Sequence, residues 1–355
     1  MTDWTEDALF RESFGSGNWV SSIDRFATPA FRLSVNTSRY VGAPYDHVDA
    51  YQALFEVFKP ILQRDAQRLL MIGETGKPRR RKSITADDWE PFKQQREIHA
   101  EDDRYFIGFD YQSGFDKSEW PKPSEVPTGY IRYDVGPTKF LSRDGSNGRL
   151  EACIPVPDFV AGNIDLDALK AAMLGLPVYG ALAGFGMCHS DTFDWPHGKE
   201  KYLQNIAHKF PVLDVCGSQQ REFSFSDDDD TTKHWIPGIN WLTLVRDPYL
   251  SAMGGVDAVT KRLDSAITVE TGNGGVLFQL GDRPITGQKG VDDDLLPLYF
   301  ELGQRLQPKG DGAPSEAVPW QKPFGHENCN PDQDRANLNW ARRFYDRTWF
   351  EEDTP

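Results

Sequence analysis

Apolar residues in the first half of the chain recur with two spacings, which predict both strands and helices. Residues 31–35 alternate apolar and polar side chains, a pattern typical of a half-buried strand. Residues 49–62 carry large apolar side chains at helical spacing and predict a core-facing amphipathic helix. The same patterns predict strands at 105–111, 129–135, 150–156 and 179–187, and helices at 84–96, 165–174 and 199–210.

The second half of the chain repeats this order of strand, helix, paired strands and helix. The paired strands are predicted at 266–270 and 275–280. The intervening Gly272-Asn-Gly-Gly275 indicates a hairpin turn rather than a phosphate loop, because no Lys-Ser/Thr follows it. The other predicted elements are a strand at 240–245 and helices at 256–263, 295–306 and 337–350.

These elements predict an α+β fold of two related units, each an antiparallel sheet with helices packed on one side. Between the units lies a polar, acidic stretch without periodicity, which we interpret as a connector. The predicted divisions are an N-terminal segment 1–28, a first unit 29–211, the acidic connector 212–237, and a second unit 238–355 that ends in a loop and a helix.

The charge of the chain narrows the choice of partner. Its 54 acidic and 39 basic residues give a net charge of −15, while 39% hydrophobic residues suffice for a sizeable core. So negative a protein is poorly suited to bind nucleic acid or an anionic membrane. A basic protein is the partner that the charge favours.

Three further features favour a cytoplasmic protein. The first ten residues are acidic and do not resemble a signal peptide, and no apolar run is long enough to cross a bilayer. The cysteines Cys153, Cys188, Cys216 and Cys329 are widely spaced, which fits a reducing compartment better than a disulfide scaffold.

The sequence contains little that points to catalysis. Phosphate-loop, dinucleotide-loop, zinc-quartet and nucleophile-elbow motifs are all absent, so we predict no catalytic residues and no cofactor. One cluster could hold a metal ion and defines the alternative of a metal-dependent hydrolase: His189, Asp191, Asp194 and His197. The basic residues 77–82 are interpreted as a loop.

Two acidic runs are the candidate binding residues. Asp227, Asp228, Asp229 and Asp230 lie in the connector and either face a partner or form a solvated loop. Nearby Trp235 could serve as an aromatic anchor. Asp292, Asp293 and Asp294 directly precede a predicted helix, where they could equally stabilise its positive end.

A set of glycine-punctuated motifs in the second half resembles the type VI secretion immunity family. The resemblance covers residues 30–310, and its motifs, in chain order, are Phe193-Asp-Trp-Pro-His-Gly-Lys-Glu200, Gly238-Ile-Asn-Trp-Leu-Thr-Leu-Val245, Met253-Gly-Gly-Val-Asp257, Gly275-Val-Leu-Phe-Gln-Leu-Gly-Asp-Arg-Pro284, Gly287, Asp292–Asp294, Leu298-Tyr299 and Leu306-Gln-Pro308.

This resemblance implies a non-enzymatic immunity protein that binds an effector toxin, a nuclease, and neutralises it in the cytoplasm. An acidic protein could fill the basic cleft in which a nuclease holds phosphates. Two alternatives stay open at this point: the metal-dependent hydrolase, and a structural or adaptor protein of the secretion apparatus.

Overall fold

The computed structural model places most of the strands and helices predicted above in one architecture, but within the described part of the predicted helix 84–96 it has the short 3-10 helix Asp87–Trp89 instead. It describes residue 5 and residues 27–36, 48–72, 78–81, 83–92, 107–113, 128–135, 149–178, 180–189, 200–215, 238–247, 249–306, 324, 331–345 and 347–351.

One antiparallel sheet runs through the part of the chain that the structure describes. Its ten strands lie in the order β3-β2-β4-β5-β6-β1-β7-β8-β10-β9. In chain order they are β1 (Ala27–Asn36), β2 (Ala66–Ile72), β3 (Pro78–Arg81), β4 (Ile107–Ser113), β5 (Gly129–Val135), β6 (Arg149–Pro155), β7 (Gly180–His189), β8 (Leu242–Arg246), β9 (Ile267–Gly272) and β10 (Gly275–Leu280).

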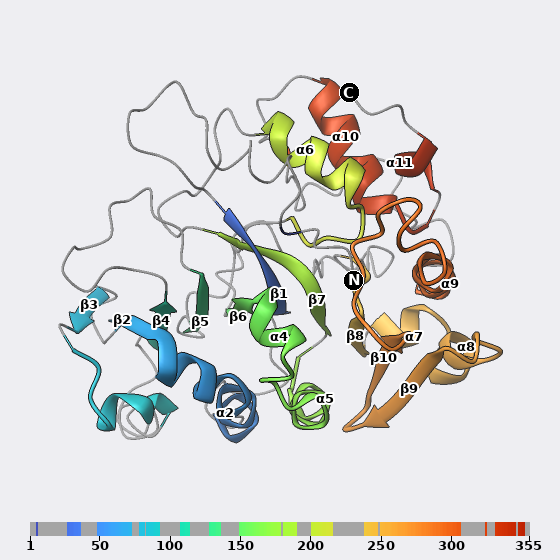
Figure 1. The fold of residues 1–355 in the computed structure, drawn as a ribbon. Coiled ribbons are helices and arrows are strands. Elements are labelled where there is room, and N and C mark those ends of the chain that lie inside the picture. The colour runs from blue at the N-terminus through green and yellow to red at the C-terminus, as the bar shows by residue number, and fades with distance from the viewer. Residues whose placement is uncertain are drawn as a thin grey trace.

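Helices lie on both sides of this sheet. α2 and α5 lie together on one side, while α6, α10 and α11 gather on the other (Figure 1). In chain order the helices are α2 (Val48–Asp65), the 3-10 helix η3 (Asp87–Trp89), α4 (Val156–Val160), α5 (Leu166–Gly175), α6 (Glu200–Lys209), α7 (Tyr249–Ala252), α8 (Val256–Thr260), α9 (Leu296–Arg305), α10 (Pro331–Arg342) and α11 (Thr348–Glu351).

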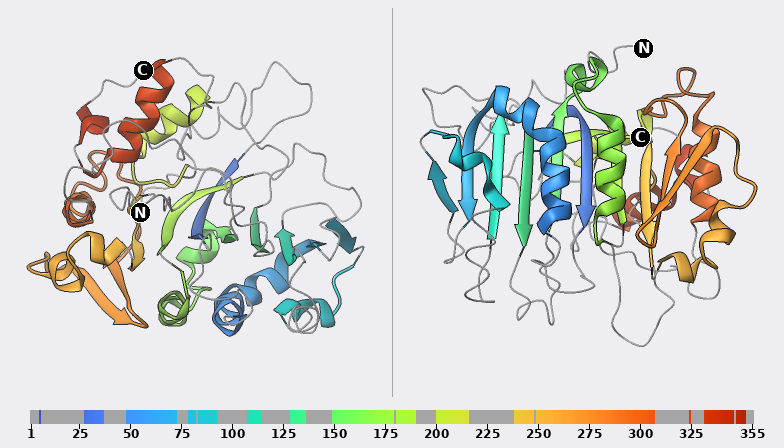
Figure 2. Two further views of the ribbon diagram at one scale, coloured as in Figure 1. Left: turned by 180° about the vertical axis from the view of Figure 1, so that it is seen from behind. Right: turned by 90° about the horizontal axis from the view of Figure 1, so that it is seen from below.

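The predicted amphipathic helix at 49–62 is confirmed as α2, which lies along the strands in the view from below (Figure 2). Its ring of Phe55 packs 5.5 Å from that of Phe109 on β4, and Tyr51 packs 5.2 Å from Tyr133 on β5. The five apolar residues predicted to face inward are all buried: Tyr51, Leu54, Phe55, Phe58 and Leu62.

Local turn chemistry also agrees with the sequence reading. Asp165 caps α5 by accepting a hydrogen bond from the Ala168 backbone N–H at 3.0 Å. β9 and β10 form the predicted hairpin, and Asn273 and Gly274 between them both have positive φ, at 50° and 75°. Two such residues match the twist of the flanking strands, which explains why Asn-Gly stands there.

A second apolar cluster holds the helices on the far side of the sheet. Trp349 of α11 donates a hydrogen bond from Nε1 to the Ala207 carbonyl of α6 at 3.1 Å, and its ring stacks on His208 at 3.8 Å. Burial lowers the pKa of His208. Trp340 of α10 is buried in the same cluster. The last predicted helix at 337–350 is thus two helices, with the first beginning at Pro331.

The α+β class and the antiparallel pairing are confirmed, but the arrangement differs from the predicted one. β7 pairs with both β1 and β8, so the strands of the two predicted units form one sheet with helices on both sides. The paired strands β7 and β8 lie some 60 residues apart in the chain. Local hydrophobic patterns cannot predict a pairing between segments so far apart. The division into two domains stays a prediction, and the sheet crosses it without a break.

Two local interpretations also need correction. The stretch read as a basic loop contains β3, an edge strand that pairs with β2 through Pro78–Arg81. Positively charged residues on an edge strand discourage pairing with another chain.

The predicted acidic connector begins inside the core, because its first residues are buried: Val212, Leu213, Asp214 and Val215. No helix in the described part of the chain is long and apolar enough to span a bilayer.

Candidate functional site

A row of charges, buried except for the half-buried Arg68, crosses the sheet. On β1, Phe31 and Leu33 belong to the main apolar core, while Arg32 points the other way and is only 1% exposed. Polar side chains on neighbouring strands continue this pattern. We call them the charged row, which consists of Arg68, Asp110, Arg132, Glu151, Arg32 and Asp214.

Arg32 lies at the centre of the charged row. It donates from Nη2 to Glu151 Oε1 at 2.9 Å and from Nη1 to the Met187 carbonyl at 3.3 Å. Its Nε lies 3.7 Å from Asp214 Oδ2. The Tyr130 hydroxyl donates to the second oxygen of Glu151 at 3.1 Å. These contacts link β5, β6, β1 and β7 with the start of the connector.

Arg132 forms the second centre of the row. Its Nη2 donates to Asp110 Oδ2 at 3.0 Å, and Gln112 Nε2 donates to the same oxygen at 2.6 Å. Arg68 Nη1 then donates to Gln112 Oε1 at 3.1 Å. The row therefore spans the sheet from β2 to β7, with cations and carboxylates in alternation.

Burial and charge act in opposite directions on the guanidinium groups of this row. Desolvation disfavours the charged form of Arg32, but Glu151, together with Tyr130 and Cys153, outweighs it and raises the pKa of Arg32 above its ordinary value. For Arg132 the carboxylate of Asp110 has the same effect on the pKa. Burial raises the pKa of the Tyr130 hydroxyl, so it stays a hydrogen-bond donor. The row is a matched set of fixed charges, and we assign it a structural role.

Gly186 of β7 allows the backbone of Asp214 to lie directly beside the sheet. The backbone of Asp214 bonds to β7 on both sides of Gly186, donating to the Phe185 carbonyl and accepting from Met187 N–H, each at 3.1 Å. A Cβ on Gly186 would lie 2.8 Å from Asp214 Cβ and 3.3 Å from Arg32 Cβ. Glycine is needed there because two backbones approach closely.

We expect Gly186→Ala to lower the free energy of unfolding by about 1–3 kcal/mol. The new methyl group has to push Asp214 away from β7, which also lengthens the Arg32–Asp214 contact. Urea denaturation followed by tryptophan fluorescence measures the change.

Gly175→Ala is the matched control, because a Cβ at this last residue of α5 meets nothing within 4 Å. It should leave stability unchanged or raise it by up to about 1 kcal/mol, since alanine restricts the unfolded chain. Equal midpoints for the two variants would contradict the packing argument at Gly186.

The predicted acidic residues at 292–294 lie in a loop with a defined internal structure. Asp292 is only 6% exposed, and its Oδ2 accepts hydrogen bonds from the backbone N–H groups of Thr286, Gly287 and Gln288 at 3.0, 2.9 and 3.3 Å. The Thr286 hydroxyl donates to the same oxygen at 2.8 Å. This carboxylate therefore holds the loop together, a role that the sequence reading missed.

The neighbouring carboxylates point outward from the same loop, which we call the acidic loop (residues 281–295). Asp293 accepts from Gly290 N–H at 2.9 Å and is exposed. The side chain of Asp294 is 64% exposed and that of Asp282 is 86% exposed. No side chain of the loop caps α9, whose N-cap is Leu295. The loop therefore presents exposed carboxylates, of which Asp282 and Asp294 lie 3.6 and 3.7 Å from Arg283.

The other candidate residues lie mainly outside the described residues. This holds for Asp227–Asp230 and Trp235 of the connector. It also holds for Asp191, Asp194 and His197 of the metal-site alternative, while His189 ends β7. Within the described ranges no group of three or more His, Cys, Asp or Glu side chains could hold a metal ion.

Comparisons with known proteins add independent evidence. Residues 174–344 match a family model described as type VI immunity for VRR-NUC (TsiV). The fold is similar to that of a Pseudomonas aeruginosa T6SS protein, PA0821, with a TM-score of 0.65 and 18% identity, over 90% of this chain and 82% of that chain. At this identity the likeness concerns the fold alone. No curated protein matches the chain significantly.

The segment 174–344 resembles the type VI secretion immunity proteins that the family model describes. The resemblance predicted from the glycine-punctuated motifs is confirmed for residues 174–344, whereas residues 30–173 of the predicted range lie outside the match. The matched segment contains the hairpin of β9 and β10 and the acidic loop.

Proposed function

We propose that this chain binds a VRR-NUC nuclease effector of a type VI secretion system in the cytoplasm and blocks its active-site region. Immunity then requires binding alone, with no reaction catalysed by this chain. The observation that carries the proposal is the family match over residues 174–344, whose description names immunity for VRR-NUC.

Charge supports blockage of the active-site region. A nuclease holds phosphates in a basic cleft, and a protein of net charge −15 is attracted to such a cleft. The buried Asp292 orders the backbone of the acidic loop, while Asp282 and Asp294 lie near Arg283 and Asp293 accepts from Gly290 N–H, so these exposed carboxylates need little further ordering when they meet cations. We place these three residues, together with Asp227–Asp230 and Trp235, in the effector interface.

Fast association is the expected benefit of this charge. Electrostatic steering raises association rates toward about 10⁸–10⁹ M⁻¹s⁻¹ at low salt. Such speed suits an inhibitor that has to reach a toxic nuclease before the enzyme cuts chromosomal DNA. The structural role of the charged row is compatible with this function, because a fixed sheet keeps the interface preorganised.

A titration of nuclease activity tests the proposal. With effector nuclease at a fixed concentration, inhibition should be complete near one equivalent of this chain, because each inhibitor occupies one active site. One-to-one inhibition would fit a protein–protein interface of standard size, which buries roughly 1,200–2,000 Å² of surface. DNA cleavage at increasing ratios of chain to effector gives the stoichiometry.

The acidic loop provides the matched variant. Asp293→Asn with Asp294→Asn should slow association and flatten its salt dependence, while asparagine keeps the acceptor that Gly290 N–H needs. Complete inhibition at strongly sub-stoichiometric ratios would show that the chain modifies the toxin, and would overturn the non-enzymatic proposal. An absence of inhibition at any ratio would overturn the nuclease as partner.

A further inference from the structure

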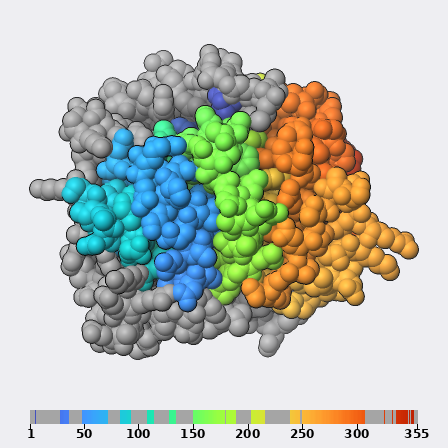
Figure 3. Space-filling model, turned by 60° about the horizontal axis from the view of Figure 1, so that its bottom comes forward, coloured from blue at the N-terminus to red at the C-terminus, as the bar shows by residue number. Residues whose placement is uncertain are grey.

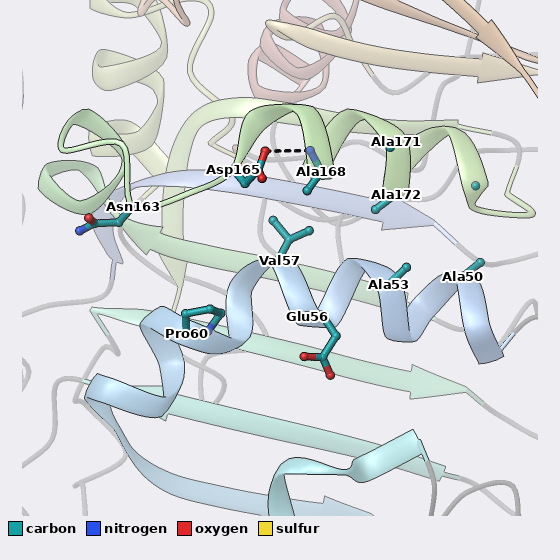
Figure 4. Close-up of a pocket in the computed structure, with 11 residues that line it drawn as sticks. Ala50, Ala53, Glu56, Val57, Pro60, Asn163, Asp165, Ala168, Ala171 and Ala172 are labelled. Carbon is teal, nitrogen blue, oxygen red and sulfur yellow. Dashed lines mark hydrogen bonds between the residues drawn. The ribbon is translucent and has the colours of Figure 1, made fainter.

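A groove separates α2 and α5 on the side of the sheet opposite α6 and α10. Its volume is about 590 Å³. The close-up shows the two helices side by side, with small apolar side chains lining the space between them (Figure 4). On α2 these are Ala50, Ala53 and Val57, and on α5 they include Ala168 and Ala171.

The helical spacing of these residues produces the groove. Ala50, Ala53 and Val57 are three and four positions apart on α2, and Ala168 and Ala171 are three apart on α5, so each set forms one stripe. The space-filling view shows the surfaces of the two helices next to each other (Figure 3). Alanine side chains are too short to cover the space between the helix backbones, so another helix can approach closely.

Negative charge surrounds the groove. Glu56 and Asp165 lie among its lining residues. Each basic residue of α2 and α5 already lies near two carboxylates: Lys59 near Glu56 and Glu90, Arg64 near Asp65 and Asp158, and Lys170 near Asp167 and Glu270. The carboxylates therefore outnumber the cations on this surface, and a partner has to supply positive charge.

We propose that this groove receives a helix of the nuclease effector that has a small apolar face flanked by Lys or Arg side chains. The inference rests on the proposed function and assigns that partner a second contact besides the acidic loop. A second copy of this chain is a poor occupant, because it would bring the same excess of carboxylates. The groove is smaller than a complete interface and would form the apolar centre of a larger one.

Filling the groove tests the assignment. Ala53 and Ala171 are exposed, so a tryptophan at either position has room and leaves the core unchanged. The probe is a purified VRR-NUC nuclease domain, and the measurement is its Kd by isothermal titration calorimetry. We expect Ala53→Trp and Ala171→Trp each to weaken binding at least about tenfold, as blocked central contacts do.

Two controls separate the possible causes. Ala86→Trp places the same side chain at an exposed alanine outside the groove and should bind like the wild type. Glu56→Gln keeps the size of the side chain, removes one charge and should reduce the association rate and its salt dependence. Unchanged thermal midpoints confirm that the variants are folded.

The outcomes distinguish this inference from the proposed function. If the wild type binds the nuclease and both groove variants bind equally well, the groove assignment is wrong and the immunity function stands. If the wild type does not bind, the proposed function fails, and the groove assignment with it. If sedimentation shows a wild-type dimer that Ala171→Trp converts to a monomer, the occupant is a second copy and the inference is overturned.

Discussion

Arg32→Met should lower the free energy of unfolding by about 3–5 kcal/mol, the largest effect that we expect from a single polar substitution in this chain. Methionine fills much of the same volume but leaves Glu151 and Asp214 buried without the cation between them. Each of these carboxylates is at most 4% exposed, so water cannot replace the lost partner without opening the sheet. Urea denaturation of the purified chain measures the change.

A surface arginine and a double variant complete this experiment. Arg335→Met removes a cation that is 71% exposed and pairs only locally with Asp332, so it should change stability by less than about 0.5 kcal/mol. Adding Glu151→Gln to Arg32→Met should cost less than the sum of the two single changes, because Glu151 is then no longer a buried charge deprived of Arg32, although Asp214 still is. If Arg32→Met and Arg335→Met lowered the free energy of unfolding by similar amounts, the charged row would not stabilise the sheet as proposed.

Leu302→Ala should cost about 2–5 kcal/mol through lost transfer energy and the cavity left behind. Leu302 of α9 is fully buried, and the next residue, Gly303, lies so close to Phe344 that a Cβ there would be 2.5 Å from its carbonyl oxygen. The tight contact prevents α9 from moving inward to fill the space. The free energy of unfolding from urea denaturation measures the loss.

Leu296→Ala is the control on the same helix. Leu296 is half-buried at the first turn of α9, so its truncation should cost clearly less than that of Leu302. A Leu302→Ala variant that unfolds at the wild-type midpoint would place this side chain outside the core.

Elements with a strong local signal could be predicted from the sequence. The helix at 49–62 follows the 3.6-residue period, and the Asn-Gly turn fixes the β9–β10 hairpin by backbone sterics alone. β2 was missed because α2 ends at Asp65 and the strand starts at Ala66, with no turn residue between them. The single sheet was missed because strand order depends on contacts far apart in the chain.

The site was harder to predict, because composition does not tell which carboxylates face inward. Asp292, Asp293 and Asp294 look alike in sequence, yet a turn buries the first and exposes the other two. The alternation at residues 31–35 predicts a half-buried strand, whereas the polar Arg32 and Ser34 are buried as well. One signal does point to this packing: Gly184 and Gly186 alternate on one face of β7, a sign of close approach, by the Asn240 side chain at Gly184 and by Asp214 at Gly186.

The pairing of β1 with β7 bears on whether the matched segment can fold without the first half of the chain. The matched residues 174–344 include β7 but not β1. All ten residues of β1 pair with β7. If residues 174–344 were produced alone, the edge of β7 that pairs with β1 would be unpaired. An unpaired strand edge is a template for aggregation. Main-chain ladders need no particular side chains, so the first half can diverge in sequence while it still completes this sheet. We therefore expect residues 174–344 to need the first half of the chain in order to fold stably.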